Sequence, residues 1–70
     1  MAFEEDVAAA FTFIRRAPHA CEPVTHVRLK NVRRRLLQRL SYHVYYSVDD
    51  ERAIVTVLAF WHTSRRPPRL

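Results

Sequence analysis

The sequence predicts an α+β fold in which one N-terminal helix packs on a small antiparallel sheet of three strands. Residues 3–17 carry apolar side chains at helical spacing, two later segments alternate in the manner of strands, and an acidic Asp-Asp-Glu turn separates those two segments. A chain of 70 residues is long enough for one small domain, so we expect residues 1–70 to form a single domain.

The predicted helix covers residues 3–17. Its apolar face is formed by Phe3, Val7, Ala10, Phe11 and Ile14. Acidic side chains occupy the first turn and two arginines occupy the last turn, which complements the helix dipole. Pro18 ends the helix, because a proline lacks the amide hydrogen and clashes with the preceding turn.

Residues 32–40 fit two patterns. As a helix, the segment would place Val32, Leu36, Leu37 and Leu40 on one face. As a strand, it would place Val32, Leu36 and Leu40 on one side and Arg33, Arg35 and Arg39 on the other. The helical pattern accounts for marginally more residues, so the residues alone leave both structures open.

Residues 43–48 and 52–62 are the two clear strands. The first is rich in alternating aromatic and β-branched side chains, and residues 49–51 form the turn after it. The second is apolar on both sides, with Ile54, Thr56, Leu58 and Phe60 on one and Val55, Val57, Ala59 and Trp61 on the other. Such a strand is expected to be covered on both faces or to lie centrally. Residues 63–70 form a basic tail, in which two prolines cannot continue the sheet.

Arginine dominates the charge of the chain. Twelve Lys and Arg residues against seven Asp and Glu give a net charge of +5, and eleven of the twelve cations are arginine. Residues 15–48 carry eight of these cations and one acid, Glu22, whereas residues 1–14 and 49–51 each carry three acids. Because arginine binds phosphate and carboxylate groups through two parallel hydrogen bonds, this distribution predicts a polyanion or an acidic protein as partner.

The remaining composition narrows the class of protein. Cys21 is the single cysteine, so no internal disulfide can form, and no Cys/His spacing resembles a metal site. No apolar run approaches the roughly 20 residues of a membrane span. The sequence therefore favours a cytoplasmic protein that has no membrane partner and uses neither a metal nor a cofactor.

Residues 32–68, VRRRLLQRLSYHVYYSVDDERAIVTVLAFWHTSRRPP, resemble the C-terminal half of the RelE/ParE superfamily of bacterial toxins. They are most similar to the ParE-like members, often called plasmid stabilisation proteins. The shared features are Arg-Arg before alternating leucines, a Tyr-His-Val-Tyr-Tyr strand, an acidic turn, an Ile-Val-x-Val-Leu-Ala strand, and Trp-His before Arg-Arg-x-Pro. Residues 3–18 resemble the family's second helix. The resemblance implies a strand at residues 33–39, which resolves the ambiguous segment.

Members of this family usually begin with a further strand and helix, which residues 1–70 lack. One helix would then cover a sheet that two normally cover, and apolar surface and an unpaired strand edge would be exposed. This comparison predicts a homo-oligomer formed through the sheet edge, or dependence on an antitoxin.

The resemblance implies the toxin component of a type II toxin–antitoxin module. A ParE-like toxin binds and inhibits a cellular target such as DNA gyrase, and a cognate antitoxin neutralises it. The residues expected to bind the target or the antitoxin are Arg33, Arg35, Arg39, His62, Arg65 and Arg66. For each arginine taken singly, a solvated basic surface is the competing interpretation.

Two alternatives stay open. A RelE-like toxin would be an enzyme that cleaves messenger RNA on the ribosome, with His43, His62 and Arg65 as the only catalytic candidates. Against this, His43 and Thr63 stand where that branch has arginines, and its C-terminal tyrosine has no counterpart. The second alternative is an inactive, truncated remnant that binds only the antitoxin.

Overall fold

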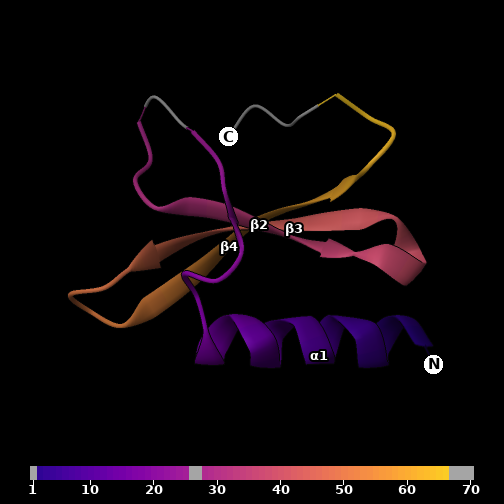
Figure 1. The fold of residues 1–70 in the computed structure, drawn as a ribbon, viewed down its shortest axis with the longest axis horizontal. Coiled ribbons are helices and arrows are strands. Elements are labelled where there is room, and N and C mark those ends of the chain that lie inside the picture. Colours follow the sequence, from indigo (N-terminus) through magenta and orange to yellow (C-terminus); the bar gives the residue numbers. More distant parts are fainter. Residues whose placement is uncertain (1, 26–27, 67–70) are drawn as a thin grey trace.

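The computed structural model describes residues 2–25 and 28–66 (Figure 1). One helix, α1 (Ala2–Arg16), precedes four strands, β1 (Glu22–Pro23), β2 (Val32–Leu37), β3 (Tyr42–Asp49) and β4 (Ile54–His62). The strands form one antiparallel sheet in the order β1-β2-β3-β4. The predicted α+β class, with a helix packed on an antiparallel sheet, is confirmed. Of the predicted basic tail, residues 67–70 lie outside the described residues.

The sheet has one strand more than the sequence predicts. β1 is only two residues long, and Glu22 and Pro23 pair with Arg34 and Arg33 of β2. A proline lacks the amide hydrogen that a central strand needs, but it is tolerated at a sheet edge. Two residues cannot show an alternating pattern, so the sequence carries no signal for this strand.

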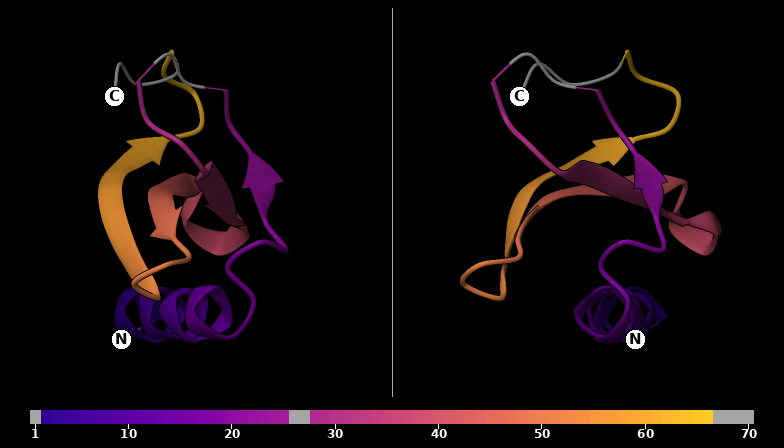
Figure 2. Two further views of the ribbon diagram at one scale, coloured as in Figure 1. Left: turned by 90° about the vertical axis from the view of Figure 1, so that its left-hand side faces the viewer. Right: turned by 60° about the vertical axis from the view of Figure 1, so that its left-hand side comes forward.

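Helix α1 lies across one face of the sheet, as Figures 1 and 2 show. Its buried residues Ala10 and Ile14 pack with the inward side chains of the sheet. The core cluster on this side consists of Ala10, Ile14, Cys21, Leu37, Val44, Tyr46 and Val48. Val32 and Tyr45 are also buried. Within residues 2–25 and 28–66, no helix is long and apolar enough to cross a membrane.

Strand pairing assigns every side chain of β2 and β3 to one of two faces. Directly paired residues point to the same side, so Arg33, Arg35 and Leu37 share the face of Tyr46, Val44 and Tyr42. We call this the helix face, because α1 covers it. The opposite face, which we call the outer face, carries Val32, Arg34 and Leu36 of β2 and His43, Tyr45 and Ser47 of β3. Figure 2 shows that residues 24–25 and 28–31, between β1 and β2, and residues 63–66, after β4, extend on this outer side.

A β-bulge corrects the alternation that the sequence predicts for β4. Tyr45 pairs with Ala59 and Tyr46 pairs with Val57, so Leu58 is the extra residue. The parity of the strand changes there: Val55 and Val57 lie on the helix face before the bulge, and Phe60 and His62 lie on it afterwards. The outer face takes Ile54, Thr56, Ala59 and Trp61. Both sides of this strand look apolar in the sequence because the bulge changes which alternate residues face the helix. β4 itself lies at the edge of the sheet.

The chain contains no glycine, and its three described left-handed positions fall on other residues. Asn31, Ser41 and Ala53 have φ angles of 55°, 56° and 54°. Ser41 follows a short 3₁₀ helix, Gln38–Leu40. The strand expected at residues 33–39 therefore ends at Leu37, and Arg39 lies in the 3₁₀ helix. Alanine gains no local hydrogen bond from its side chain, so this conformation costs about 1–2 kcal/mol at Ala53.

Candidate partner-binding surfaces

Two of the arginines expected to bind a partner face the helix. The Arg33 guanidinium donates hydrogen bonds to the carbonyl oxygens of His19 and Cys21 at 2.9 and 2.8 Å. The Arg35 guanidinium lies 3.8 Å from the centre of the Phe13 ring on α1. Both cations thus fasten the helix and the segment after it to the sheet.

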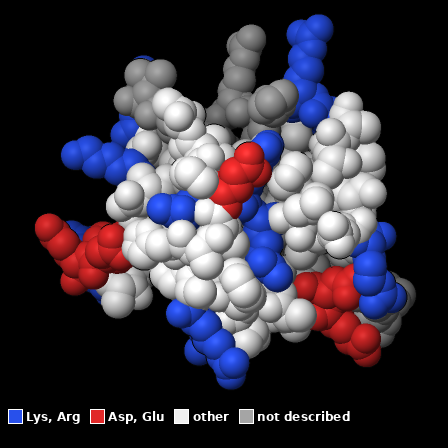
Figure 3. All heavy atoms as spheres, in the orientation of Figure 1, with Lys and Arg blue, Asp and Glu red and all other residues white. Residues whose placement is uncertain are grey.

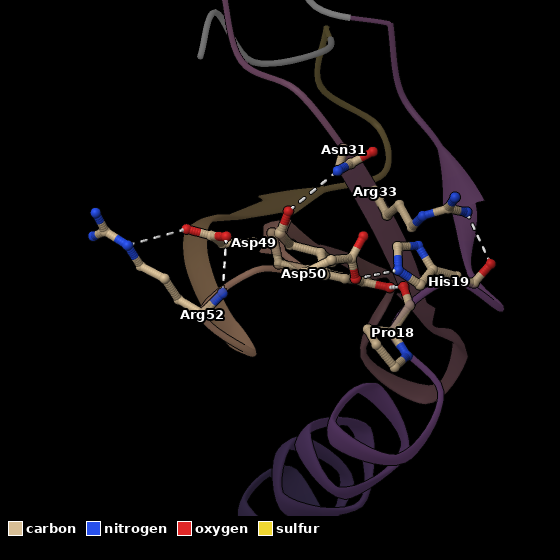
Figure 4. Close-up of polar contacts among 9 residues, drawn as sticks. Pro18, His19, Asn31, Arg33, Asp49, Asp50 and Arg52 are labelled. Carbon is tan, nitrogen blue, oxygen red and sulfur yellow. Dashed lines mark hydrogen bonds and ion pairs between the residues drawn. The ribbon is translucent and has the colours of Figure 1, made fainter.

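The attachment around Arg33 includes three further polar contacts. The Tyr46 hydroxyl donates to the carbonyl oxygen of Pro18 at 2.9 Å, and the His19 and Asp50 side chains meet at 2.7 Å. The Asn31 amide also donates to the carbonyl oxygen of Val48 at 3.4 Å. Figure 4 shows these groups gathered where α1 ends, beside the turn between β3 and β4. These contacts attach the segment after α1 to the sheet, so Arg33 has a structural role.

Arg39 is the strand-region arginine that stays accessible. Its side chain is 69% exposed, and Nη1 lies 3.5 Å from Asp6 Oδ1 on α1. The two residues border a groove of about 520 Å³ between α1 and β2, with Ala10 and Cys21 among its lining residues. The second Asp6 oxygen, Oδ2, is buried and accepts no hydrogen bond within the described residues. Because this oxygen is buried, the group that the groove offers to a partner is the exposed cation of Arg39.

The two histidines considered as an acid–base pair lie on opposite faces of the sheet. His43 pairs with Trp61 on the outer face, whereas His62 pairs with Tyr42 on the helix face. The ring centres of Tyr42 and His62 are 5.1 Å apart at 86°. The arrangement therefore does not bring the two imidazoles together. Within residues 2–25 and 28–66, no three His, Cys, Asp or Glu side chains gather to hold a metal ion.

Arg34 is the outer-face arginine that the sequence interpretation missed. It forms a two-pronged ion pair with Glu22, with Nε to Oε2 at 2.7 Å and Nη2 to Oε1 at 3.0 Å. Its Nη1 also donates to the Tyr45 hydroxyl at 3.3 Å. The hydrogen bonds from Arg34 lower the pKa of Glu22, and those to Glu22 and Tyr45 raise the pKa of Arg34. The sequence could not identify Arg34, because three consecutive arginines do not reveal which of them face the helix.

His43 stands beside this pair, and its environment makes stability depend on pH. Burial lowers the pKa of His43, and the charge of Arg34 lowers it further. The unfolded chain therefore binds a proton on this imidazole more readily than the folded chain. Stability should fall as pH decreases from the unfolded pKa of 6.5 to the lowered folded value, and should be unaffected by His43 above that window.

Urea denaturation between about pH 5 and pH 7.5 checks this expectation. We expect the His43→Gln variant to lose part of the pH dependence of the unfolding free energy in this range. Protonation of Glu22, whose pKa is lowered, acts below its ordinary value of 4.5 and so falls outside the window. An unchanged slope in the variant would contradict the assignment to His43.

The last residue of β4, His62, and the four residues after it form a basic segment with a defined conformation, which we call the C-terminal arm (residues 62–66). The Thr63 amide donates to the carbonyl oxygen of Ser41 at 2.9 Å, and the Arg65 amide donates to that of His62 at 3.1 Å. The Ser64 amide donates to His62 Nδ1 at 3.1 Å, and the Ser64 hydroxyl lies 2.7 Å from the same nitrogen. Local hydrogen bonds thus order the arm.

Trp61 anchors the arm on the outer face. Its indole Nε1 donates to the carbonyl oxygen of Arg66, and the Arg65 guanidinium lies 4.6 Å from the ring centre. Both arginine side chains of the arm are exposed. Among the predicted binding residues, His62, Arg65 and Arg66 are therefore gathered in one segment at the end of β4. Arg33 and Arg35 instead contact α1 and the segment after it.

Charge on the visible surface is interspersed. In Figure 3, cationic side chains project at several places around the outline, with acidic side chains between them. The excess of cations in residues 15–48 thus does not appear on this side as one continuous basic face. A partner that recognises this surface must use a local feature, such as the C-terminal arm.

Residues 2–67 match the family model described as the ParE toxin of the type II toxin–antitoxin system, parDE. No curated protein and no solved structure matches the chain.

Proposed function

The chain belongs to the ParE toxin family of type II toxin–antitoxin systems, and we propose that it acts by binding and inhibiting a cellular target, DNA gyrase. Family membership implies an antitoxin as partner. The observation that carries the proposed mode of action is the C-terminal arm, which is ordered, exposed and basic. A rigid cationic segment loses little conformational entropy on binding, so it suits recognition of a large protein by shape and charge.

Inhibition by binding also agrees with the placement of the catalytic candidates. His43 and Arg34 lie on the outer face and His62 lies on the helix face, so general acid and general base would be separated by the sheet. In addition, Arg34 already donates two hydrogen bonds to Glu22. A phosphate group would have to compete with this carboxylate for the guanidinium.

One observation favours a RelE-like ribonuclease as a second candidate. Arg34, Tyr45 and His43 place a guanidinium, a phenol and an imidazole on one face, with the ring centres of His43 and Tyr45 6.1 Å apart. The Arg34 guanidinium can stabilise a phosphate and the His43 imidazole can move protons, whereas the Tyr45 side chain is buried and orients Arg34. The candidate requires that RNA displaces Glu22 from Arg34.

Antitoxin binding is proposed at the groove between α1 and β2. The exposed cation Arg39, whose contact with Asp6 is 3.5 Å long, suits an acidic antitoxin segment. A partner in this groove would contact α1 and β2 together and would leave the C-terminal arm accessible.

The test is induced expression of the chain in bacteria, with and without a candidate antitoxin, scoring DNA breaks and translation separately. We expect growth arrest with DNA breaks and intact translation, and the purified chain should inhibit supercoiling by purified gyrase. Growth arrest with collapsed translation and intact DNA would instead support the ribonuclease. Unimpaired growth together with uninhibited gyrase would contradict toxin activity of these residues.

A further inference from the structure

The free edge of β4 lacks the features that normally keep sheet edges apart. β4 ends the strand order, and within the described residues no strand pairs with its far side. Its nine residues, Ile54–His62, include no Asp, Glu, Lys, Arg or Pro. Exposed edges are usually kept short or protected by charges and proline. The opposite edge shows this protection, because β1 consists of Glu22 and Pro23.

Apolar side chains surround the β4 edge. Ile54, Val57 and Phe60 are 48%, 42% and 42% exposed. Val57 and Phe60 lie on the helix face on either side of the Leu58 bulge. The Phe60 ring and the Phe11 ring of α1 form a T-shaped contact, with their centres 6.2 Å apart. The edge therefore combines unpaired backbone groups with an apolar surface that is only half covered.

The charges at the two ends of β4 indicate what pairs with it. The segment before the strand carries three acidic residues, Asp49, Asp50 and Glu51, and one cation, Arg52, which contacts Asp49 at 3.8 Å. The acids outnumber the cation there, and Arg65 and Arg66 follow the other end of β4. In an antiparallel pair of two β4 strands, the acidic end of one copy meets the basic end of the other. A parallel pair would bring like charges together. The edge is thus complementary in charge to a second copy of itself.

We propose that the chain forms a symmetric homodimer in which β4 pairs antiparallel with β4 of a second copy. The two sheets become one continuous sheet with both helices on the same face, and the edge-strand amides gain partners. This inference concerns association of the isolated chain and does not rest on the proposed target.

The bulge restricts the register of this dimer. Val57 precedes the bulge and Phe60 follows it, and both point to the helix face. Placing Val57 opposite Phe60 of the second copy keeps helix-face residues together and buries two pairs of apolar side chains across the symmetry axis. A slip of one residue would oppose Val57 with Ala59, which points to the outer face.

The first experiment is sedimentation equilibrium of the full chain with a matched pair of lysine variants. Val57 and Leu36 are 42% and 43% exposed, but Leu36 lies on the interior strand β2, away from this edge. We expect the wild type and Leu36→Lys to be dimers at about 100 μM and Val57→Lys to be a monomer with an unchanged circular dichroism spectrum. A monomeric wild type, or equal dissociation of both variants, would overturn the proposal.

The second experiment tests the orientation of the two copies. Glu51→Arg and Arg66→Glu should each weaken the dimer about two- to fivefold at low salt, because each places like charges together. The double variant should recover the wild-type dissociation constant, since both ends are then reversed. Loss without recovery would overturn the antiparallel arrangement. Hydrogen exchange of the β4 amides gives a further check. Amides that become protected only when antitoxin is added, and not when the chain concentration is raised, would assign the edge to the antitoxin instead.

Discussion

The Tyr46→Ala variant is expected to be unfolded at 25 °C. Tyr46 is 0% exposed and is among the largest fully buried side chains of the core. Truncating a buried aromatic residue costs about 3–5 kcal/mol. A core of this size rarely supplies more than about 3–5 kcal/mol of net stability, so the loss is comparable with the whole. Far-UV circular dichroism and urea denaturation measure the outcome.

The Tyr46→Phe variant separates packing from hydrogen bonding. It retains the ring and removes only the hydroxyl that donates to the carbonyl oxygen of Pro18 at 2.9 Å. Loss of this bond should cost about 1 kcal/mol, and the variant should remain folded with a lower urea midpoint. A folded Tyr46→Ala variant, or equal losses in both, would show that Tyr46 does not hold the core together.

Removing the two charges of the C-terminal arm should have the largest effect on function. We expect the double variant Arg65→Gln/Arg66→Gln to raise the concentration that half-inhibits gyrase supercoiling about 10- to 30-fold and to abolish growth arrest. Both side chains are exposed, so the substitutions should leave the free energy of unfolding within about 0.5 kcal/mol of the wild-type value.

The matched control is Arg15→Gln/Arg16→Gln at the end of α1, which removes the same charge from another exposed pair. We expect it to change gyrase inhibition by no more than about threefold and to destabilise the helix by about 0.3–1 kcal/mol through the helix dipole. Equal effects of the two variants on inhibition would mean that net charge, and not the arm, determines target binding.

The sequence could predict the elements whose signal is local. The helical spacing from Val7 to Ile14 located α1, and the aromatic and β-branched pattern around Val44 located β3. The position of Trp61 and His62 before a basic segment likewise identified the region that becomes the C-terminal arm. These features depend on the order of side chains along a few turns or one strand.

What the sequence could not predict depends on contacts between distant segments. Arg33, Arg34 and Arg35 are chemically identical neighbours, and only strand pairing assigns the first and third to α1 and the second to Glu22. The bulge at Leu58 leaves no mark in an unbroken apolar strand, so the faces of Val57 and Phe60 could not be assigned. The sequence thus located the basic segment that becomes the arm, whereas the face of the arginine-rich strand required the structure. That these residues bind a partner stays a prediction.

The order of the strands has a consequence for how quickly the toxin reaches its folded structure. Every strand of the sheet pairs with its neighbour in the chain, and short connections join β2 to β3 and β3 to β4. Such local topologies fold in about milliseconds, whereas a ribosome needs seconds to synthesise 70 residues at about 5–20 residues per second. The chain should thus finish folding almost as soon as it is released. An antitoxin then encounters a completed protein and must neutralise it by covering its surface, because there is no time to divert its folding.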